Sequence, residues 1–455
     1  MSLIYKSLYI KALSCTIYIY VISYTHRLRE DNMDKFVKFV EERLSGPMNK
    51  LANQRHLLAI RNGIIATLPL IIVGSVFLTV AFLPFGKDWP IFGLIQANAG
   101  AVLLPYRVTM AIMTLYAVFG IGLNLAESYK LDGLSGGILA TAAFLLTINP
   151  AVTEEIGWAI PMGPLSGGGM FVGIVASIIA VEIYRFTDRS NFKISMPEQV
   201  PPSVARSFEA LVPTAIIVLG FGAVTYWIGF DWHGFIATLI VPLVSAADTL
   251  PSVLVLVFLV TFFWSFGIHG VSIVGSIARP LWLTLLAGNE TALAAGEAIP
   301  HIAAEPFFQW FIWIGGSGAT IGLAIAMAFF AKSTYAKTLG RTAIGPAIFN
   351  INEPIIFGAP IVLNPILMVP FMIVPLVNAT IAWFATKLFL VNRVTSVPPW
   401  TLPGPIGALL ATNFDWRALV LNVVLIITSF LMYYPFFKLY DNKLLAEENE
   451  ELEVE

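Results

Sequence analysis

Residues 344–376 read IGPAIFNINEPIIFGAPIVLNPILMVPFMIVPL, a strongly apolar stretch that six prolines interrupt. One carboxylate, Glu353, lies inside it with apolar residues on both sides. In hydrocarbon, a backbone broken by proline is tolerated only where it is buried in protein or lines a wet cavity. A charged side chain at membrane depth is costly and marks a functional site. The stretch therefore predicts a membrane protein whose second half encloses a polar site.

The composition of the whole chain supports this prediction. Of its 455 residues, 57% are apolar and 12% are charged, and the mean hydropathy is +0.81. A soluble domain carries about 25% charged residues. The apolar residues form continuous runs, which argues against a β-barrel. The net charge of -2 offers no basic excess for nucleic acid. We therefore predict an all-α polytopic membrane protein with about ten transmembrane helices, at about 20 residues per span.

Cysteine and histidine usage excludes several kinds of site. Cys15 is the single cysteine, so the chain contains no disulfide framework and no CxxC metal site. Its five histidines are scattered, without an HExxH motif, and no P-loop is present. The glycines at 167–169 lack a following lysine and predict close helix packing instead. We expect no metal and no cofactor.

Apolar runs and positive charges predict the organisation along the chain. The runs of the first half are 62–83, 108–125, 134–148, 167–185 and 210–230. Those of the second half are 251–278, 307–331, 344–391 and 418–437, with a second proline-rich break at 397–407. Lys50, Arg55 and Arg61 precede the first run, which predicts a cytoplasmic N-terminus. Lysine and arginine also cluster in the predicted cytoplasmic loops 185–206 and 332–341, and the last run ends at Lys438 and Lys443, so the C-terminus is predicted to be cytoplasmic too. Region 280–304 is too polar for hydropathy to decide its topology.

These features divide the chain into six segments. Met33 starts an amphipathic helix and is the natural beginning, so residues 1–32 are predicted to be a non-native upstream extension; a signal or extra helix there is the alternative. The predicted segments are 1–32 extension, 33–61 cytoplasmic amphipathic helix, 62–230 five-helix N-terminal domain, 231–250 interfacial connector, 251–440 C-terminal domain and 441–455 acidic, solvated cytoplasmic tail.

Glu353 and His269 are the candidate catalytic residues. Pro354 disfavours helical geometry at Glu353, so we expect the backbone to open there. Burial among apolar residues suits this carboxylate to accept a hydroxyl proton; the alternative is a carboxylate held at a helix end. His269 lies between Gly267 and Gly270, which permit a bend or a close backbone approach. Its imidazole can donate to a sugar or a phosphoryl group, or it is simply a packing residue.

Four other residues are candidates with competing interpretations. Trp400 can cover the face of a sugar ring or anchor the chain at the membrane interface. Asn352 and Asn378 can hydrogen-bond hydroxyls or cap broken helices. Arg279 is a topology anchor or a phosphate contact, and the sequence does not separate these roles.

Three motifs together resemble a known family: FGIHG at 266–270, NEPIIFGAPIVLNP at 352–365 and PPWTLPGPIGA at 398–408. They are similar to the lactose/cellobiose/diacetylchitobiose branch of the enzyme IIC sugar permeases of the phosphotransferase system. NEPIIFG is the most specific of the three. The resemblance runs from about residue 33 to residue 445.

The resemblance implies a homodimer of ten-helix protomers with the glucose-superfamily IIC architecture. It implies that the N-terminal helices form the dimer interface and that the C-terminal half, with two re-entrant hairpins, encloses one disaccharide, with cellobiose or N,N'-diacetylchitobiose expected. Glu353 is then the proposed general base, with His269 beside it. The sugar-contact roles of Asn352 and Trp400 are inferred from their positions.

The resemblance also implies partners in a bacterial inner membrane. The phosphoryl donor is a phosphocysteine on a separate IIB protein, itself phosphorylated through IIA. Since Cys15 lies in the predicted extension, this chain cannot contain that IIB domain. It is thus a transporter subunit, with phosphotransferase activity only together with IIA and IIB. Two alternatives remain: an ion-coupled secondary transporter with Glu353 as proton relay, and a membrane sensor that binds sugar without moving it.

Overall fold

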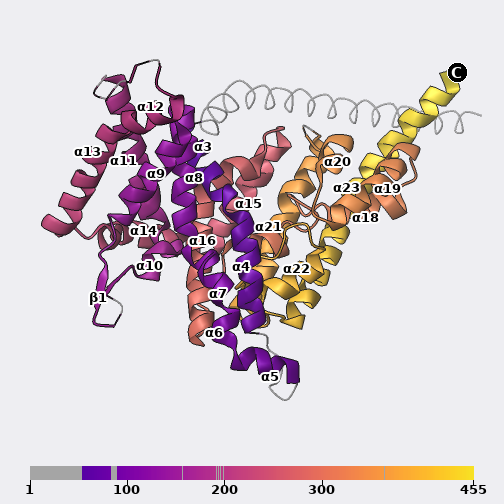
Figure 1. Ribbon diagram of the computed structural model, residues 1–455. Coiled ribbons are helices and arrows are strands. Elements are labelled where there is room, and N and C mark those ends of the chain that lie inside the picture. The colour runs from indigo at the N-terminus through magenta and orange to yellow at the C-terminus, as the bar shows by residue number, and fades with distance from the viewer. Residues whose placement is uncertain are drawn as a thin grey trace, which may run out of the picture.

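The computed structural model describes residues 54–82, 90–155, 157–190, 192, 194, 196–197, 199–362 and 364–454 (Figure 1). Helices dominate this part of the chain. Five are long and apolar enough to cross a membrane, two bent pairs qualify as broken spans, and three more apolar helices are shorter. The predicted all-α polytopic fold is confirmed. The predicted extension 1–32, and the predicted amphipathic helix up to residue 53, lie outside the described residues.

The first half of the described chain forms a bundle drawn in indigo and magenta in Figure 1. Its α-helices are α3 Arg55–Ala66, α4 Leu68–Ala81, α5 Pro90–Ala97, α6 Ala99–Val102, α7 Leu104–Arg107, α8 Met113–Ser128, α9 Gly133–Leu145, α10 Met162–Leu165, α11 Met170–Arg189, α12 Pro202–Glu209 and α13 Leu211–Gly222. Short 3-10 turns cover Met110–Ile112 and Gly167–Gly169, and a π-helical turn covers Ala223–Trp227. Strands β1 Ala151–Thr153 and β2 Gly157–Ala159 pair antiparallel, with Val152 opposite Trp158.

The second half contains more breaks. Its helices are α14 Trp232–Ala247, α15 Leu250–Ser265, α16 Gly270–Ala295, α17 Glu305–Phe311, α18 Ile321–Phe330, α19 Thr334–Ile348, α20 Glu353–Gly358, α21 Pro365–Lys387, α22 Gly404–Ala411 and α23 Trp416–Val454. The connector predicted at 231–250 is helical, because α14 fills it and bends 86° away from the helix before it. Its place at the membrane interface stays a prediction.

The glycines at 167–169 pack closely, as predicted. A Cβ added to Gly167 would lie 2.7 Å from the Cβ of Ala287 and 2.8 Å from the carbonyl oxygen of Leu283. Both neighbours belong to α16. Thr284 on the same helix donates to the Gly167 carbonyl at 3.2 Å. This glycine therefore lets the first half approach α16, which lies between the two halves (Figure 1).

Two predictions of a single span are wrong. Within the run 251–278, helix α15 ends at Ser265 and a second helix, α16, begins at Gly270. Helix α16 continues to Ala295, into the region 280–304 whose topology hydropathy did not decide. The run 307–331 is likewise divided into α17 and α18 by residues 312–320. In that loop Gly315, Gly316 and Gly318 have positive φ. Hydropathy does not register such breaks, because glycine interrupts a helix without adding polarity.

The C-terminal segment is more than a solvated tail. Helix α23 continues to Val454. The carboxylate of Asp441 accepts from the backbone N–H groups of Lys332 and Ser333 at 2.8 and 3.1 Å. The carboxylate of Glu448 accepts from those of Thr334 and Tyr335 at 3.0 and 2.9 Å. The two carboxylates therefore hold the N-terminus of α19, where free N–H groups favour an anion.

Candidate functional site

A cavity of about 370 Å³ lies where the breaks of the second half meet α3 and α4. The four predicted site residues, His269, Asn352, Glu353 and Trp400, all line it. The other lining residues are Ile65, Leu68, Ile72, Trp264, Val271, Arg279, Glu305, Pro306, Gln309, Trp310, Trp313, Gly316, Ser317, Asn350, Val397 and Pro398. Its volume and mixed lining are those of a small-molecule site.

The break between α15 and α16 positions His269. Gly267 has φ +76°, in the left-handed region that favours glycine. A Cβ on Gly270 would lie 2.0 Å from the carbonyl oxygen of Val260, so the close approach requires glycine there. His269 follows the turn as the N-cap of α16. The bend and the close approach predicted for this motif are both confirmed.

Hydrogen bonds assign the tautomer of His269. Its Nδ1 accepts from the backbone N–H of Ser272 at 3.1 Å and lies 3.0 Å from the Ser272 hydroxyl. A backbone N–H can only donate, so Nδ1 carries no proton and the neutral ring holds its proton on Nε2. The indole of Trp264 packs against the ring, with centroids 4.5 Å apart. His269 is thus an oriented donor through Nε2–H.

Asn350 joins three segments around the cavity. Its φ is +62°, a conformation that asparagine tolerates better than most residues. Its Oδ1 accepts from the backbone N–H of Gly315 at 2.9 Å. Its Nδ2 donates to the carbonyls of Trp400 and Leu402 at 2.8 and 3.0 Å. Sequence reasoning did not single out this residue; the available signal was an asparagine between two helices, where freed backbone groups need partners.

Asn352 and Glu353 follow at the tip of the α19–α20 hairpin. Asn352 is buried and donates one amide hydrogen to the carbonyl of Ser317 at 2.7 Å, which leaves its second hydrogen and its oxygen for a ligand. Glu353 is the first residue of α20, with Pro354 at the next position. The backbone therefore opens just before Glu353 rather than at it. The predicted burial of Glu353 is also wrong, because the residue is exposed at the cavity.

Trp400 and other aromatic residues form much of the cavity wall. Trp400 is 49% exposed, whereas Trp264, Trp310 and Trp313 are buried. The indole N–H groups of these three buried tryptophans find no hydrogen-bond partner among the described residues. Sequence reasoning missed all three, since eleven tryptophans in an apolar chain offer no way to choose among them. The indole N–H of the buried Trp282, which does not line the cavity, likewise has no partner among the described residues, so these N–H groups are covered by protein and it is the aromatic rings that form the wall.

An ion pair crosses the same wall. Arg279 Nη2 lies 3.0 Å from Glu305 Oε1, and both side chains are largely buried. The second oxygen, Glu305 Oε2, is buried without a partner among the described residues. Arg279 lies within α16 rather than at the end of a span. It is therefore a wall residue of the cavity, and its partner is a carboxylate of the same chain.

Asn378 does not join this site. It lies within α21, fully buried, and its Nδ2 donates to the hydroxyl of Ser429 on α23 at 2.9 Å. The predicted alternative of capping a broken helix is wrong, because α21 is continuous there. Asn378 joins two helices.

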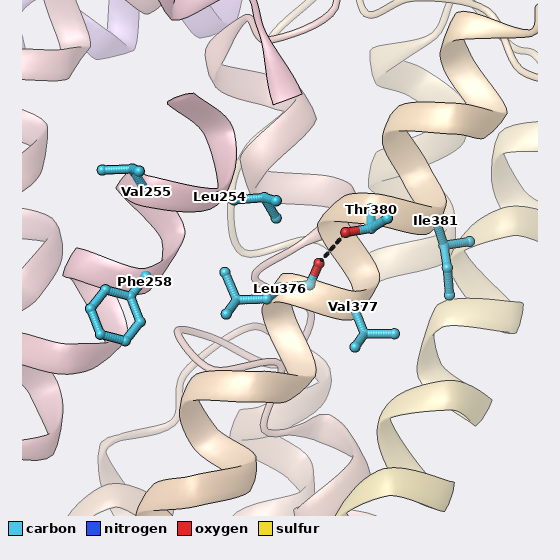
Figure 2. Close-up of a pocket in the computed structure, with 7 residues that line it drawn as sticks. All are labelled: Leu254, Val255, Phe258, Leu376, Val377, Thr380 and Ile381. Atoms are coloured by element: carbon cyan, nitrogen blue, oxygen red, sulfur yellow. Dashed lines mark hydrogen bonds between the residues drawn. The ribbon is translucent and has the colours of Figure 1, made fainter. Parts of the chain in front are cut away.

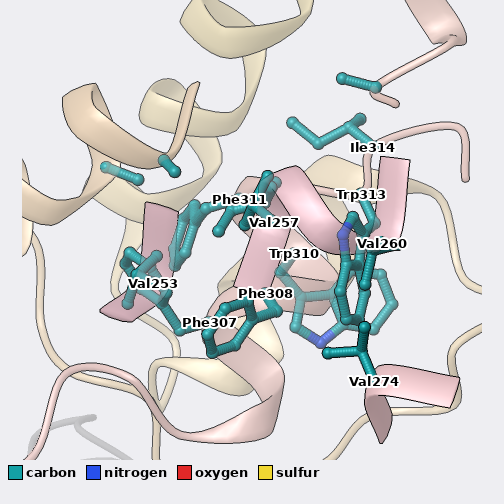
Figure 3. Close-up of a cluster of buried hydrophobic side chains, with 14 of the residues drawn as sticks. Val253, Val257, Val260, Val274, Phe307, Phe308, Trp310, Phe311, Trp313 and Ile314 are labelled. Atoms are coloured by element: carbon teal, nitrogen blue, oxygen red, sulfur yellow. The ribbon is translucent and has the colours of Figure 1, made fainter. Parts of the chain in front are cut away.

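Close packing supports the aromatic wall from behind. Figure 3 shows the rings of α17 and the following loop packed with valines of α15 and α16. The ring of Trp282 lies against that of Phe308, tilted by 36° with the centroids 4.6 Å apart. A Cβ on Gly407 would lie 2.0 Å from the ring of Trp310. The wall is thus part of the main core, which limits how far it can adapt to a different ligand.

A second hollow, between α15 and α21, lacks the means to bind a sugar. Figure 2 shows its lining: Leu254, Val255, Phe258, Leu376, Val377, Thr380 and Ile381. Its one hydroxyl, on Thr380, already donates to the carbonyl of Leu376 at 2.8 Å. The candidate site is therefore the cavity with His269 and Glu353.

A family profile described as "Phosphotransferase system, EIIC" matches residues 61–375, more than half of the chain. The chain belongs to this family. Its relatives include the lichenan permease IIC component of Bacillus subtilis, 38% identical over 92% of this chain and 96% of the relative. The cellobiose-specific EIIC component of Geobacillus stearothermophilus is 39% identical over 91% and 96%.

A solved structure of the family superposes on this EIIC protein. The crystal structure of ChbC, the IIC component from the N,N'-diacetylchitobiose-specific phosphotransferase system, matches with a TM-score of 0.86 at 37% identity, over 90% of this chain and 99% of that chain. The resemblance deduced from the three motifs is confirmed. The chain is a membrane-embedded EIIC sugar permease, which works with IIB and IIA components. The alternative of ion-coupled transport without phosphorylation finds no support.

Proposed function

We propose that this EIIC permease binds a β-linked disaccharide in the cavity and presents one sugar hydroxyl for phosphorylation. The observation that carries the proposal is the convergence of polar and aromatic side chains on one cavity. The imidazole of His269, the amide of Asn352, the carboxylate of Glu353 and the ring of Trp400 belong to residues that line it. A few polar groups in a mostly apolar pocket orient a ligand, so a polyhydroxylated ligand finds partners there that an apolar one cannot use.

Glu353 is proposed as the general base. Its carboxylate accepts the hydroxyl proton, the hydroxyl oxygen bonds to phosphorus, and the S–P bond of the phosphocysteine on IIB breaks with the thiolate leaving. The exposure of Glu353 supports this role, because the base must be reached by both sugar and partner. His269 then donates from Nε2–H to a sugar or phosphoryl oxygen. Positioning and proton removal are the permease's contribution to the transfer.

Trp400 and Asn352 are proposed sugar contacts. The half-exposed ring of Trp400 offers an apolar face, and Asn352 offers the amide atoms that the Ser317 contact leaves over. Cellobiose and N,N'-diacetylchitobiose are the proposed substrates, because two similar proteins carry these sugars in their descriptions.

The proposed assembly is a homodimer in the bacterial inner membrane, with both termini in the cytoplasm. Segment 62–230 provides the dimer interface, segment 251–440 holds the sugar, and α14 lies at the membrane interface between them. Lysine and arginine near the start of α19, on the side of the molecule that holds the C-terminus, support this orientation.

Uptake into membrane vesicles with a panel of β-linked disaccharides tests the proposal. We expect the disaccharide phosphate to accumulate inside only when phosphorylated IIB is supplied. Accumulation of unmodified sugar driven by a proton gradient would contradict it. Binding without any uptake would favour a sensor.

A further inference from the structure

A cation of the first half lies at the edge of the cavity. Ile65 of α3 lines the cavity, as do Leu68 and Ile72 of α4. Arg61 precedes Ile65 by four residues on α3, so it lies on the same side of that helix, one turn or about 6 Å nearer the helix start. The start of α3 lies at the end of the molecule that also holds the C-terminus (Figure 1). Arg61 therefore lies at the edge of the cavity toward this end.

The surroundings of His269 place Arg61 near the reacting groups. The charges of two side chains, Glu353 and Arg61, act on the imidazole of His269. Helix α3, which carries Arg61, packs against α16, whose N-cap is His269. Glu353 is the proposed base, and His269 is the proposed donor beside it. Arg61 is therefore a cation within electrostatic reach of the point where the sugar hydroxyl reacts.

The guanidinium of Arg61 carries a charge that no carboxylate within the described ranges neutralises in an ion pair. Its Nε donates to Oδ1 of Asn62 at 3.3 Å. Arg279, the cation in the cavity wall, is by contrast paired with Glu305. A guanidinium has five N–H donors, and two of them can bind two oxygens of one phosphoryl group side by side. Arg61 thus has the charge and the geometry to bind an anion.

We propose that Arg61 binds the phosphoryl group as it passes from IIB to the sugar hydroxyl. This rests on the proposed function, in which the S–P bond of the phosphocysteine breaks as the hydroxyl oxygen bonds to phosphorus and Glu353 takes the hydroxyl proton. Arg61 keeps its own protons throughout and donates N–H bonds to the phosphoryl oxygens. Its charge offsets the repulsion between the phosphoryl group, which carries nearly two negative charges, and the carboxylate of Glu353. A cation held in this way stabilises the charge on a phosphoryl group during transfer.

Binding of a disaccharide phosphate to the purified permease tests the proposal without turnover. Arg61→Gln should weaken this binding about ten- to a hundredfold, the effect of one charge-assisted hydrogen bond. Binding of the unphosphorylated disaccharide should stay within twofold of wild type. Arg55→Gln removes the same charge from the exposed start of α3 and serves as the control, with both affinities unchanged. Equal affinity of the wild type and Arg61→Gln for the disaccharide phosphate would overturn the proposal, and so would an equal loss of both ligands.

Phosphotransfer separates this proposal from the proposed function. With saturating disaccharide and phosphorylated IIB, Arg61→Gln should lower the rate of sugar phosphorylation about tenfold or more. Arg61→Lys should recover part of the rate, because lysine keeps the charge but loses the paired donors. Equal rates in the wild type and Arg61→Gln would refute this proposal alone. Failure of the wild type to form any disaccharide phosphate would refute the proposed function and this proposal with it.

Discussion

The two halves of this permease differ in how closely the apolar runs of the sequence match continuous helices of the structure. In the first half two predicted runs nearly coincide with single helices, 134–148 with Gly133–Leu145 and 167–185 with Met170–Arg189, whereas the run 62–83 bends by 41° between α3 and α4. In the second half the runs 251–278 and 307–331 are each cut in two. The difference lies in the breaks, where glycine and asparagine free the backbone and other groups of the chain satisfy it. Those breaks meet around one cavity, so the irregular half carries the site.

The largest expected effect concerns the carboxylate at the hairpin tip. Glu353→Gln should lower the rate of sugar phosphorylation by about 100- to 10,000-fold, the usual contribution of a general base. Sugar binding should persist, because the amide keeps the shape of the side chain. Formation of sugar phosphate with phosphorylated IIB measures the rate.

The matched control for this change lies in the first half. Glu154→Gln alters an exposed carboxylate in the turn between β1 and β2 and should leave the rate unchanged. Wild-type turnover in Glu353→Gln would remove this residue from the mechanism.

A substitution at Asn350 tests whether one side chain stabilises the helix breaks of the second half. Asn350→Ala removes three hydrogen bonds to the backbone and should lower the free energy of unfolding by about 3 kcal/mol, at about 1 kcal/mol per bond. It should also weaken sugar binding, because the 400–402 segment loses its anchor. Thermal unfolding in detergent and a sugar titration measure both effects.

Asn98→Ala is the counterpart in the first half, where the side chain donates to the carbonyl of Leu94 on the preceding helix. It should shift the unfolding temperature much less. Equal shifts for the two asparagines would show that the break at Asn350 has no special role in stability.

Glycine substitutions compare backbone packing in the two halves. Gly270→Ala places a Cβ 2.0 Å from the Val260 carbonyl and should destabilise the protein by about 1–3 kcal/mol. Gly220→Ala on α13 meets nothing within 4 Å and should stay within about 1 kcal/mol of wild type. Unfolding curves of the two variants decide this. A tolerated Gly270→Ala would contradict the close approach of α15 and α16.

The smallest expected effect concerns the support of His269. Ser272→Ala removes the hydroxyl contact to Nδ1 but keeps the backbone cap, and should weaken sugar binding about two- to tenfold, the range of one hydrogen bond. Nitrogen NMR should find the ring proton on Nε2 in the wild type. Ser272→Thr should restore affinity, and Ser190→Ala at the end of α11 should have no effect. A proton on Nδ1 would contradict the assigned tautomer.

The four predicted site residues line one cavity, but their surroundings could not be predicted. Glu353 and His269 stand out because an ionisable side chain within an apolar membrane segment costs free energy, and such residues therefore mark functional sites. The tryptophans of the wall and the linking role of Asn350 did not stand out, because their residue types are ordinary in a membrane protein. The burial of Glu353 was predicted from its neighbours in sequence, and it is wrong because the hairpin leaves this residue exposed at the cavity.

The sequence by itself determined that this chain is a polytopic membrane protein of the EIIC family, and which ionisable residues lie within its apolar runs. Local composition suffices for this, because solvation by the bilayer acts on each segment separately. Only the tertiary structure decided where the helices break and which breaks meet. Those outcomes depend on contacts between distant segments, such as Gly270 against Val260 or Asn350 against Trp400. The cavity exists because these contacts satisfy the backbone that the breaks release.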